Sequence, residues 1–371
     1  MRIKDDATAR SCTSDGAPVI SVFDHPWLGG LFADEDACEI WSPDRQLSHM
    51  LAFEAAYSRA LGAADVSDAK TATSAAEVIE TFKPDMQELR DGTAKDGLPI
   101  PALVAQLKRA AGPLASAIHT GTTSQDVLDT ALALTLRENT ELLLTRLQAL
   151  IGQLDRLNKK FGTNPLMGRT RMQAAMPITV SDRIAAWRAP VESHRSRLQE
   201  LRPRVEKLQL GGAAGDRKQM EPNAARIARA IAQTLDLAEP DFTWHTARDG
   251  IAEYAGLLSL ISGTLGKMGQ DICLMAQQGL DDIQVSGGGG SSAMPHKQNP
   301  ILAELLVTLA RFNATQLSGM HHALVHEQER SGSAWALEWM ILPQMAVAAS
   351  RSLAAGKSLC EHVTAMGGAT K

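Results

Sequence analysis

The sequence predicts an all-α protein whose long helices pack in a bundle. Over long stretches its apolar residues recur at alternating steps of four and three. This period of about 3.5 residues is typical of helices that bury a narrow seam against other long helices. Hydrophobic residues make up 44% of the chain and aromatic residues only 4%, a composition that favours helices over β-sandwiches or barrels. We identify no stretch with the alternating period of a strand and predict no strands.

Three seams follow this period, at residues 143–157, 180–208 and 251–275. In the second seam, His194 occupies the one position that lacks an apolar side chain. Seams of this length exceed what one small globule can cover. We therefore expect the helices to form a bundle between the subunits of a homotetramer.

Capping residues and prolines predict where the helices begin and bend. Ser124 is expected to cap a helix of residues 125–160, which would be roughly 50 Å long. Ser42, which is followed by a proline, is expected to start a shorter amphipathic helix. Pro190 and Pro203 lie inside the second seam and are expected to kink its helix.

The 371 residues are expected to form four regions. Residues 1–20 are polar, with scattered charges, and are interpreted as a flexible tail. Residues 21–112 are predicted to form a small helical domain, and residues 113–325 the central long-helix domain. Residues 326–371 are predicted to form a short C-terminal helical region.

Charge and hydropathy exclude several kinds of partner. Lys and Arg number 37 and Asp and Glu number 42, which gives a net charge of −5, so the chain as a whole is not attracted to nucleic acid or to anionic membranes. No apolar run approaches the roughly 20 residues of a membrane span. The four cysteines form no CxxC pair, which favours reduced thiols and a cytoplasmic location. We expect neither a membrane nor a nucleic-acid partner.

Three segments interrupt the helical pattern with residues that packing alone would not select. The first segment is residues 119–126, HTGTTSQD; the second is residues 168–173, GRTRMQ; the third is residues 287–300, GGGGSSAMPHKQNP. Each combines glycine with hydroxyl, amide or cationic side chains, as binding loops do.

The third segment gives the strongest indication of a site. Its four glycines allow the backbone to approach a ligand closely, and Pro300 marks the start of a helix. Backbone N–H groups at such a turn can hold an anion. Polar side chains that could assist follow the glycines: Ser291, Ser292, Lys297 and Asn299. The alternative is a surface linker, which would not need the run MPHKQN directly behind the glycines.

The first and second segments each leave two interpretations open. In the first, His119 and the hydroxyls that follow it suit carboxylate binding, but the same residues can form a helix cap with a polar turn. In the second, Arg169 and Arg171 are either ligands for an anion or two solvated charges. Spacing alone does not decide either case.

No metal or nucleotide motif is complete. The run that starts at His326 is similar to the start of the zinc motif HExxH, but Arg330 stands where the second histidine would be. The glycines at 287–290 lack the GK[ST] ending of a phosphate-binding loop. We expect no cofactor and no metal.

The three segments together resemble the fumarase/aspartase superfamily. GGSSAMPHKQNP is similar to the signature of that superfamily, HTGTTSQDVLDTA to its first motif and GRTRMQAA to its second. Order and approximate spacing agree, and the resemblance covers about residues 23–345. It implies an all-α fold whose longest helices join four subunits in one central bundle. It also implies active sites built from three motifs that arrive from different subunits.

The resemblance implies roles for individual residues. Ser291 matches the catalytic serine of the superfamily, and Lys297 and Asn299 match its carboxylate-binding pair. His119 and His296 are the nearest side chains that can exchange a proton near neutral pH, and which of them serves stays open. The remaining substrate-binding candidates lie in the same three segments: Thr122, Thr123, Ser124, Arg169, Gln173, Ser292 and Met294.

Arg171 departs from the superfamily pattern. The eliminating members have RTH in the second motif, whereas this chain has RTR, and arginine cannot give up its proton near neutral pH. Lactonisation has less need of that histidine, because only one carbon must gain a proton. The departure favours the 3-carboxy-cis,cis-muconate cycloisomerase family, which the stretches RDGIAEYAGLLSLISGTLGKMGQDI and EQERSGSAW also resemble.

The predicted function is therefore a cofactor-free lactonisation of a small tricarboxylated diene, a step of aromatic compound degradation. Arg171 would neutralise one substrate carboxylate, and Arg330 would reach the site from another chain. One alternative is a lyase that eliminates fumarate from a succinyl substrate. The other is a non-catalytic structural bundle.

Overall fold

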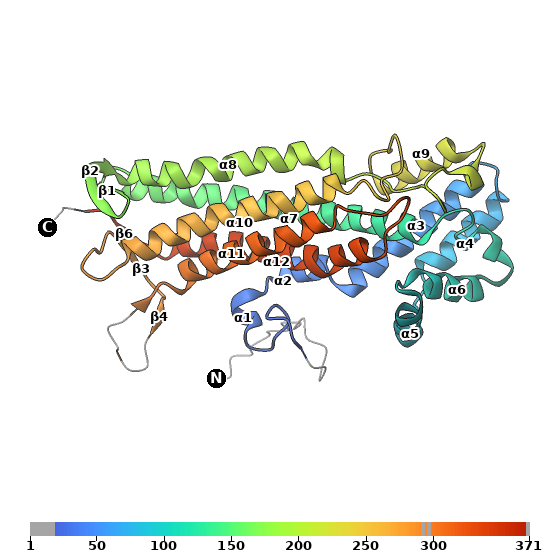
Figure 1. Cartoon of the computed structure of the whole chain (residues 1–371), viewed down its shortest axis with the longest axis horizontal. Helices are drawn as coiled ribbons and strands as arrows, with labels where there is room; N and C mark the ends of the chain where they lie inside the picture. The colour runs from blue at the N-terminus through green and yellow to red at the C-terminus, as the bar shows by residue number, and fades with distance from the viewer. Residues whose placement is uncertain (1–18, 291–293, 295–297, 369–371) are drawn as a thin grey trace, which may run out of the picture.

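The computed structural model describes residues 19–290, 294 and 298–368. The chain forms an elongated helical bundle (Figure 1), which confirms the predicted all-α class. Five long helices run side by side along the molecule: α7 (Ser124–Phe161), α8 (Val180–Val205), α10 (Asp249–Met275), α11 (Ile301–His322) and α12 (Ser333–Glu361).

Shorter helices gather at the end of the bundle where α7 begins (Figure 1). They are α3 (Pro43–Ala63), α4 (Ala69–Glu80), α5 (Met86–Asp96), α6 (Ile100–Ala111), η1 (Gly112–Ala117), η2 (Lys218–Met220) and α9 (Ala224–Leu235). Two more, α1 (Gly29–Phe32) and α2 (Glu35–Ile40), precede them, and α2 packs on α7 and α12. The predicted tail of residues 1–20 lies almost wholly outside the described residues.

The long helices bury the seams that their sequences predict. Leu143, Leu147 and Leu154 on α7 have no exposed surface, and the seam of α10 is buried in the same core. A second core fills the end with the short helices and includes the first turns of α7. Because α7 contributes to both cores, it fixes the position of one end relative to the other.

Glycine lets two of the long helices approach closely. A Cβ added at Gly269 on α10 would lie 2.5 Å from the carbonyl oxygen of Ala303 on α11, far inside van der Waals contact. These two helices make one of the most extensive contacts in the bundle. Close backbone packing of this kind gives α11 a defined position.

The predicted helix limits are mostly confirmed. The helix expected at 125–160 spans residues 124–161, and Ser42 caps α3 by accepting the N–H of Arg45. The cap of α7 is Thr123, not Ser124 as predicted, because the Asp126 carboxylate accepts the N–H of Thr123 and so moves the cap one residue back. Helix α8 continues through both of its prolines.

The prediction of no strands was wrong. Among the described residues there are three short antiparallel pairs: β1 (Pro165–Thr170) with β2 (Gln173–Thr179), β3 (Ile283–Val285) with β6 (Val363–Met366), and β4 (Gly289–Gly290) with β5 (Gln298–Asn299). They lie at the end of the bundle opposite the short helices (Figure 1). Most of β1 and β2 is exposed on both faces, so these strands have no buried face to impose an alternating pattern.

The region predicted to begin at residue 326 is continuous with the bundle. Its helix α12 packs on α7, α10 and α11 along their length, and the boundary at 325 falls in the loop between two helices of one layer. Within the described part of the chain, no helix combines the length and hydrophobicity that crossing a membrane requires.

Candidate active site

The first segment is held to the protein by the buried carboxylate of Asp126. One of its oxygens accepts the hydroxyl of Thr122 at 2.9 Å and the N–H of Thr123 at 3.1 Å. The carboxylate also accepts the N–H groups of Gly211 and Gly212, at 2.7 and 2.9 Å, and the Nε2 of His245 lies 2.9 Å away. The helix-cap interpretation of this segment is therefore confirmed, and the loop has a fixed shape in front of α7.

Three polar side chains of α3 contact this segment or the residues just before it. The hydroxyl of Ser58 donates to the carbonyl of Ala117 at 2.8 Å, and the hydroxyl of Tyr57 donates to the carbonyl of Thr120 at 2.6 Å. Burial, with Asp126 and Glu54 close by, raises the pKa of Tyr57, so this hydroxyl stays a donor. Glu54 lies 2.5 Å from Nδ1 of His119.

Sequence reasoning missed Glu54, although a signal was present. Glu54, Tyr57 and Ser58 lie at steps of three and four on one helical face, within the otherwise largely apolar run LAFEAAYSRAL. A charged residue on a helix face that is otherwise buried needs a partner. That partner is His119, the candidate of the first segment.

Arg330 also joins the first segment, and it does so within its own chain. Its Nη1 donates to the hydroxyl of Thr123 at 2.9 Å, and its Nη2 donates to the carbonyls of Gly212 and Ala213 at 3.3 and 3.1 Å. This contact follows from the topology, because the loop between α11 and α12 turns at the end of the bundle where α7 begins. That Arg330 also reaches a site of another chain stays a prediction.

The second segment forms the tip of the β1–β2 hairpin. Thr170 pairs with Gln173, and the two residues between them, Arg171 and Met172, both have positive φ, at 49° and 68°. Such a turn normally contains Asn or Gly, because other side chains are strained there. The hairpin thus holds Arg171 at an exposed tip at a cost in stability, as functional sites often do.

The other candidates of the second segment are also exposed. Gln173 begins β2, and Arg169 lies with its Nε 4.0 Å from the Asp282 carboxylate. Gly168 is required next to them, since a Cβ there would lie 2.7 Å from the carbonyl oxygen of Met176. The segment is therefore more than two solvated charges on a flexible linker: its backbone is paired and its tip is defined.

The third segment is closed at its base by β4 and β5. Gly289 pairs with Asn299 and Gly290 with Gln298, and α11 begins at residue 301 as predicted. A Cβ on Gly288 would lie 2.8 Å from the carbonyl oxygen of Asn299, so glycine permits this closure. The candidates Ser291, Ser292, His296 and Lys297 lie outside the described residues, and their roles stay predictions.

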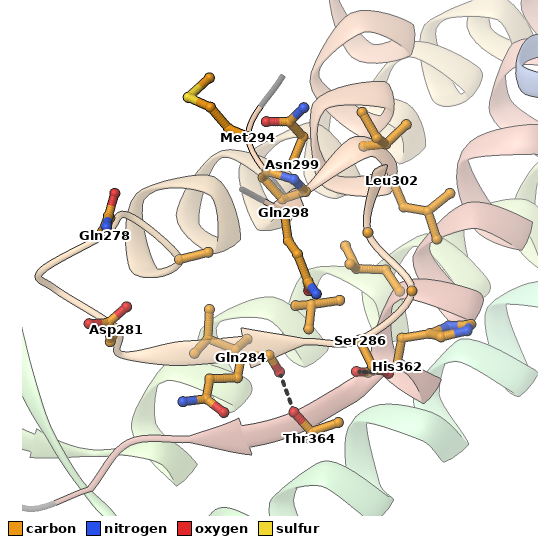
Figure 2. Close-up of a pocket in the computed structure, with 18 residues that line it drawn as sticks. Gln278, Asp281, Gln284, Ser286, Met294, Gln298, Asn299, Leu302, His362 and Thr364 are labelled. Atoms are coloured by element: carbon orange, nitrogen blue, oxygen red, sulfur yellow. Dashed lines mark hydrogen bonds between the residues drawn. The ribbon is translucent and has the colours of Figure 1, made fainter. Parts of the chain in front are cut away.

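A cavity of about 890 Å³ lies between the third segment and the β3–β6 pair. In Figure 2, Gln298 extends toward Ser286 and β3, whereas the Asn299 side chain points to the other side of β5, toward Met294. Among the described residues that line the cavity none is Lys or Arg, and Asp281 adds a negative charge. With this lining, the cavity alone does not suit a tricarboxylate.

The described residues of one chain do not bring the three segments together. The first segment precedes α7 and the second follows it, and 38 helical residues span roughly 57 Å. The second and third segments share one end of the bundle but lie on different sides of it (Figure 1). Within one chain, the first segment is therefore remote from the other two.

A long-helix bundle that presents polar loops at both ends is the architecture of a lyase-type enzyme. The chain belongs to the lyase family, whose profile matches residues 34–314. This confirms the superfamily that the three segments resemble.

Several relatives cover most of the chain. It is 36% identical over 313 residues to the 3-carboxy-cis,cis-muconate cycloisomerase of Pseudomonas aeruginosa. This alignment covers 82% of this chain and 68% of the relative. The N-acetyl-S-(2-succino)cysteine lyase of Enterococcus italicus is 30% identical over 336 residues, 90% of this chain and 74% of the relative. Among solved structures, the 3-carboxy-cis,cis-muconate lactonizing enzyme of Pseudomonas putida superposes with a TM-score of 0.85 at 34% identity, over 91% of this chain and 77% of that one.

Proposed function

We propose that this protein is a 3-carboxy-cis,cis-muconate cycloisomerase that needs no cofactor and acts in the cytoplasm. The observation that carries the proposal is Arg171, which a strained turn holds at an exposed tip where eliminating relatives have histidine. A permanent cation there suits a substrate with three carboxylates. The similarity to cycloisomerases at 33–36% identity supports the same reading.

The reaction needs one new C–O bond and one new C–H bond. A carboxylate oxygen of the substrate attacks a carbon of the substrate's own double bond. The π electrons move to the neighbouring carbon, where an adjacent carboxylate delocalises the charge until a proton arrives. Nothing leaves and no electrons are gained or lost. Binding in a bent conformation brings the reacting atoms together.

Different residues of the three segments would bind the substrate, stabilise its charge and transfer the proton. Arg171, Lys297 and Asn299 would bind carboxylates, and the backbone at 287–290 would stabilise the charge that develops on one of them. Ser291 would handle the proton at carbon; its hydroxyl is a weak acid and base and needs Lys297 and the backbone N–H groups beside it. Other contacts to the substrate would come from the rest of the three segments: Thr122, Thr123, Ser124, Arg169, Gln173, Ser292, Met294 and Arg330.

We infer that the active form is a homotetramer with shared sites. The first segment lies one full length of α7 from the other two, and an antiparallel neighbour would bring opposite ends together. Exposed apolar side chains on the long helices and their loops support this assembly, since they have nothing to pack on in one chain: Leu260, Val325 and Met340 are 53, 75 and 67% exposed.

The test is to mix purified protein with 3-carboxy-cis,cis-muconate and follow the ultraviolet absorbance of the diene. We expect the absorbance to fall with no metal or nucleotide added, and at the same rate with a chelator present. The competing function is fumarate elimination, which one relative's name suggests. Fumarate release from adenylosuccinate or a succinyl thioether, with no reaction of the muconate, would replace our proposal. Inactivity on all of these would favour the structural bundle.

A further inference from the structure

We propose that Glu54 is a positioning residue for the reaction. Its carboxylate holds the imidazole of His119 with the proton on Nδ1, which leaves Nε2 to exchange a proton at the substrate. This inference rests on the proposed function and identifies His119 as the histidine that handles the proton.

The contact between the two side chains determines the tautomer. Glu54 is completely buried, and its Oε1 lies 2.5 Å from Nδ1 of His119. An ionised carboxylate can only accept a hydrogen bond, so Nδ1 must donate. The His119 side chain keeps 15% of its surface exposed, and Nε2 is the nitrogen that remains for a ligand.

His119 is the charge partner of Glu54 in the described part of the chain. The other ionisable groups around the loop are engaged elsewhere: Asp126 is bonded to the 211–212 turn and faces His245, and Arg330 is bonded to Thr123. Tyr57 stays neutral because its pKa is raised. The Oε2 of Glu54 is buried without a hydrogen-bond partner. The ring of His119 is therefore the group that faces this buried carboxylate.

Anchoring of the loop does not explain Glu54. Tyr57 already holds the backbone of this segment through the carbonyl of Thr120, and Ser58 bonds to Ala117 in the helix η1 that precedes it. Neutral hydroxyls suffice for that purpose. A buried carboxylate is costly, and it contacts the ring of His119, whose positive φ of 57° places it at a defined point of the turn. The contact acts on the ring, not on the loop.

The proton transfer balances with this arrangement. As the carboxylate oxygen of the substrate closes the ring, the proton on Nε2 of the imidazolium passes to the neighbouring carbon, directly or through the Ser291 hydroxyl. The electron pair of the former double bond becomes the new C–H bond. The neutral imidazole then takes a proton from water, and Glu54 keeps its orientation throughout.

The experiment compares Glu54→Gln with Ser58→Ala, a matched control on the same face of α3. Glu54→Gln should lower kcat by about tenfold to a hundredfold with KM within about twofold, as expected when general acid–base catalysis loses its orienting group. The alkaline limb of its pH–rate profile, where activity falls as the donor loses its proton, should move to lower pH, because an amide does not favour a charged ring. Ser58→Ala should leave kcat and the profile unchanged.

A double variant separates positioning from an independent effect. If Glu54 acts through His119, the loss in Glu54→Gln/His119→Asn equals the loss in His119→Asn alone. Additive losses would overturn the proposal. It would also fall if Glu54→Gln kept the wild-type kcat and profile, or if Ser58→Ala reproduced its defect.

A measurement without substrate keeps this inference separate from the proposed function. In protein labelled with ¹⁵N-histidine, the ring ¹⁵N shifts of His119, assigned with His119→Asn, report which nitrogen carries the proton. We expect Nδ1–H in the wild type and a smaller share of it in Glu54→Gln. Wild-type protein that does not convert the muconate refutes the proposed function, whereas an Nε2–H ring in the wild type refutes the role of Glu54.

Discussion

At the scale of single residues, position decides what an arginine does. Arg248 is buried and forms ion pairs with Asp129 and Glu338, so its charge is used within the core that joins α7, α10 and α12. Arg330 donates hydrogen bonds to Thr123 at the start of α7 and to the nearby carbonyl of Ala213. In the described part of the chain Arg171 has no carboxylate within ion-pair distance. Its charge is therefore available to a ligand.

Replacement of Ser291 tests the proton-transfer step. We expect Ser291→Ala to lose most of its turnover while KM stays close to the wild-type value, because the hydroxyl would act only when the proton moves. Steady-state kinetics with the muconate give both constants. Unchanged turnover would assign the proton to another group, and the variants of His119 would then show which.

Arg171 can be removed in two ways that differ in strain. Arg171→Ala and Arg171→Gly both delete a charge-assisted contact worth about 1.5–3 kcal/mol, so KM should rise about tenfold to a hundredfold in each. Glycine is also relaxed at a φ of 49°, so Arg171→Gly should be more stable than the wild type by about 1 kcal/mol. Kinetics and thermal unfolding together would show a stable protein with a weakened site; unchanged KM in both variants would make Arg171 a solvated charge.

Arg171→His tests whether this position separates the reactions of the family. We expect the variant to lose lactonisation without becoming a competent lyase, because the rest of the pocket would still be shaped for a different acid. Product analysis with the muconate and with adenylosuccinate measures both activities. Efficient fumarate release by Arg171→His would show that this residue alone sets the reaction.

At the scale of elements, the sequence predicts what is periodic and misses what is local. The seams of α7 and α10 bury one face over about four and seven turns, and so leave a repeating pattern. The β1–β2 hairpin is only six and seven residues long and mostly exposed, so no pattern is required of it. Glu54 was missed for a related reason, since its partner His119 is 65 residues away along the chain.

His194 gives the bundle a predictable dependence on pH. It fills the seam of α8, its Nε2 lies 2.8 Å from the hydroxyl of Thr264, and Arg197 donates to its Nδ1. Burial, with the charge of Arg197, lowers the pKa of His194 to about 4, below its ordinary value near 6.5. The unfolded chain therefore binds the proton more readily, so this stabilising contribution is complete above about pH 6.5 and is lost as the pH falls toward 4.

His194→Leu should remove that dependence while keeping the seam filled. We expect the variant to lose less Tm than the wild type between pH 7.5 and pH 5, since leucine does not titrate and fits the apolar seam. Thermal unfolding at the two pH values measures the difference. An equal drop in both proteins would show that protonation elsewhere controls acid stability.

At the scale of the whole molecule, the separation of the three segments makes assembly a condition for activity. Light scattering in dilute solution should give the mass of four 39.7 kDa chains. Leu260→Glu and Met340→Glu place charges on faces that are exposed in one chain, so each subunit should keep its helix content while the tetramer and its turnover are lost.

Sharing of sites makes a further demand. Arg171→Ala and His119→Asn alter opposite ends of the bundle. Tetramers that contain both variants should therefore include some sites with neither change. Unfolding and reassembling the two impaired variants together should therefore recover part of the wild-type kcat/KM, whereas refolding either alone should not. A fully active monomer, or mixtures no more active than their components, would mean that each chain completes its site alone.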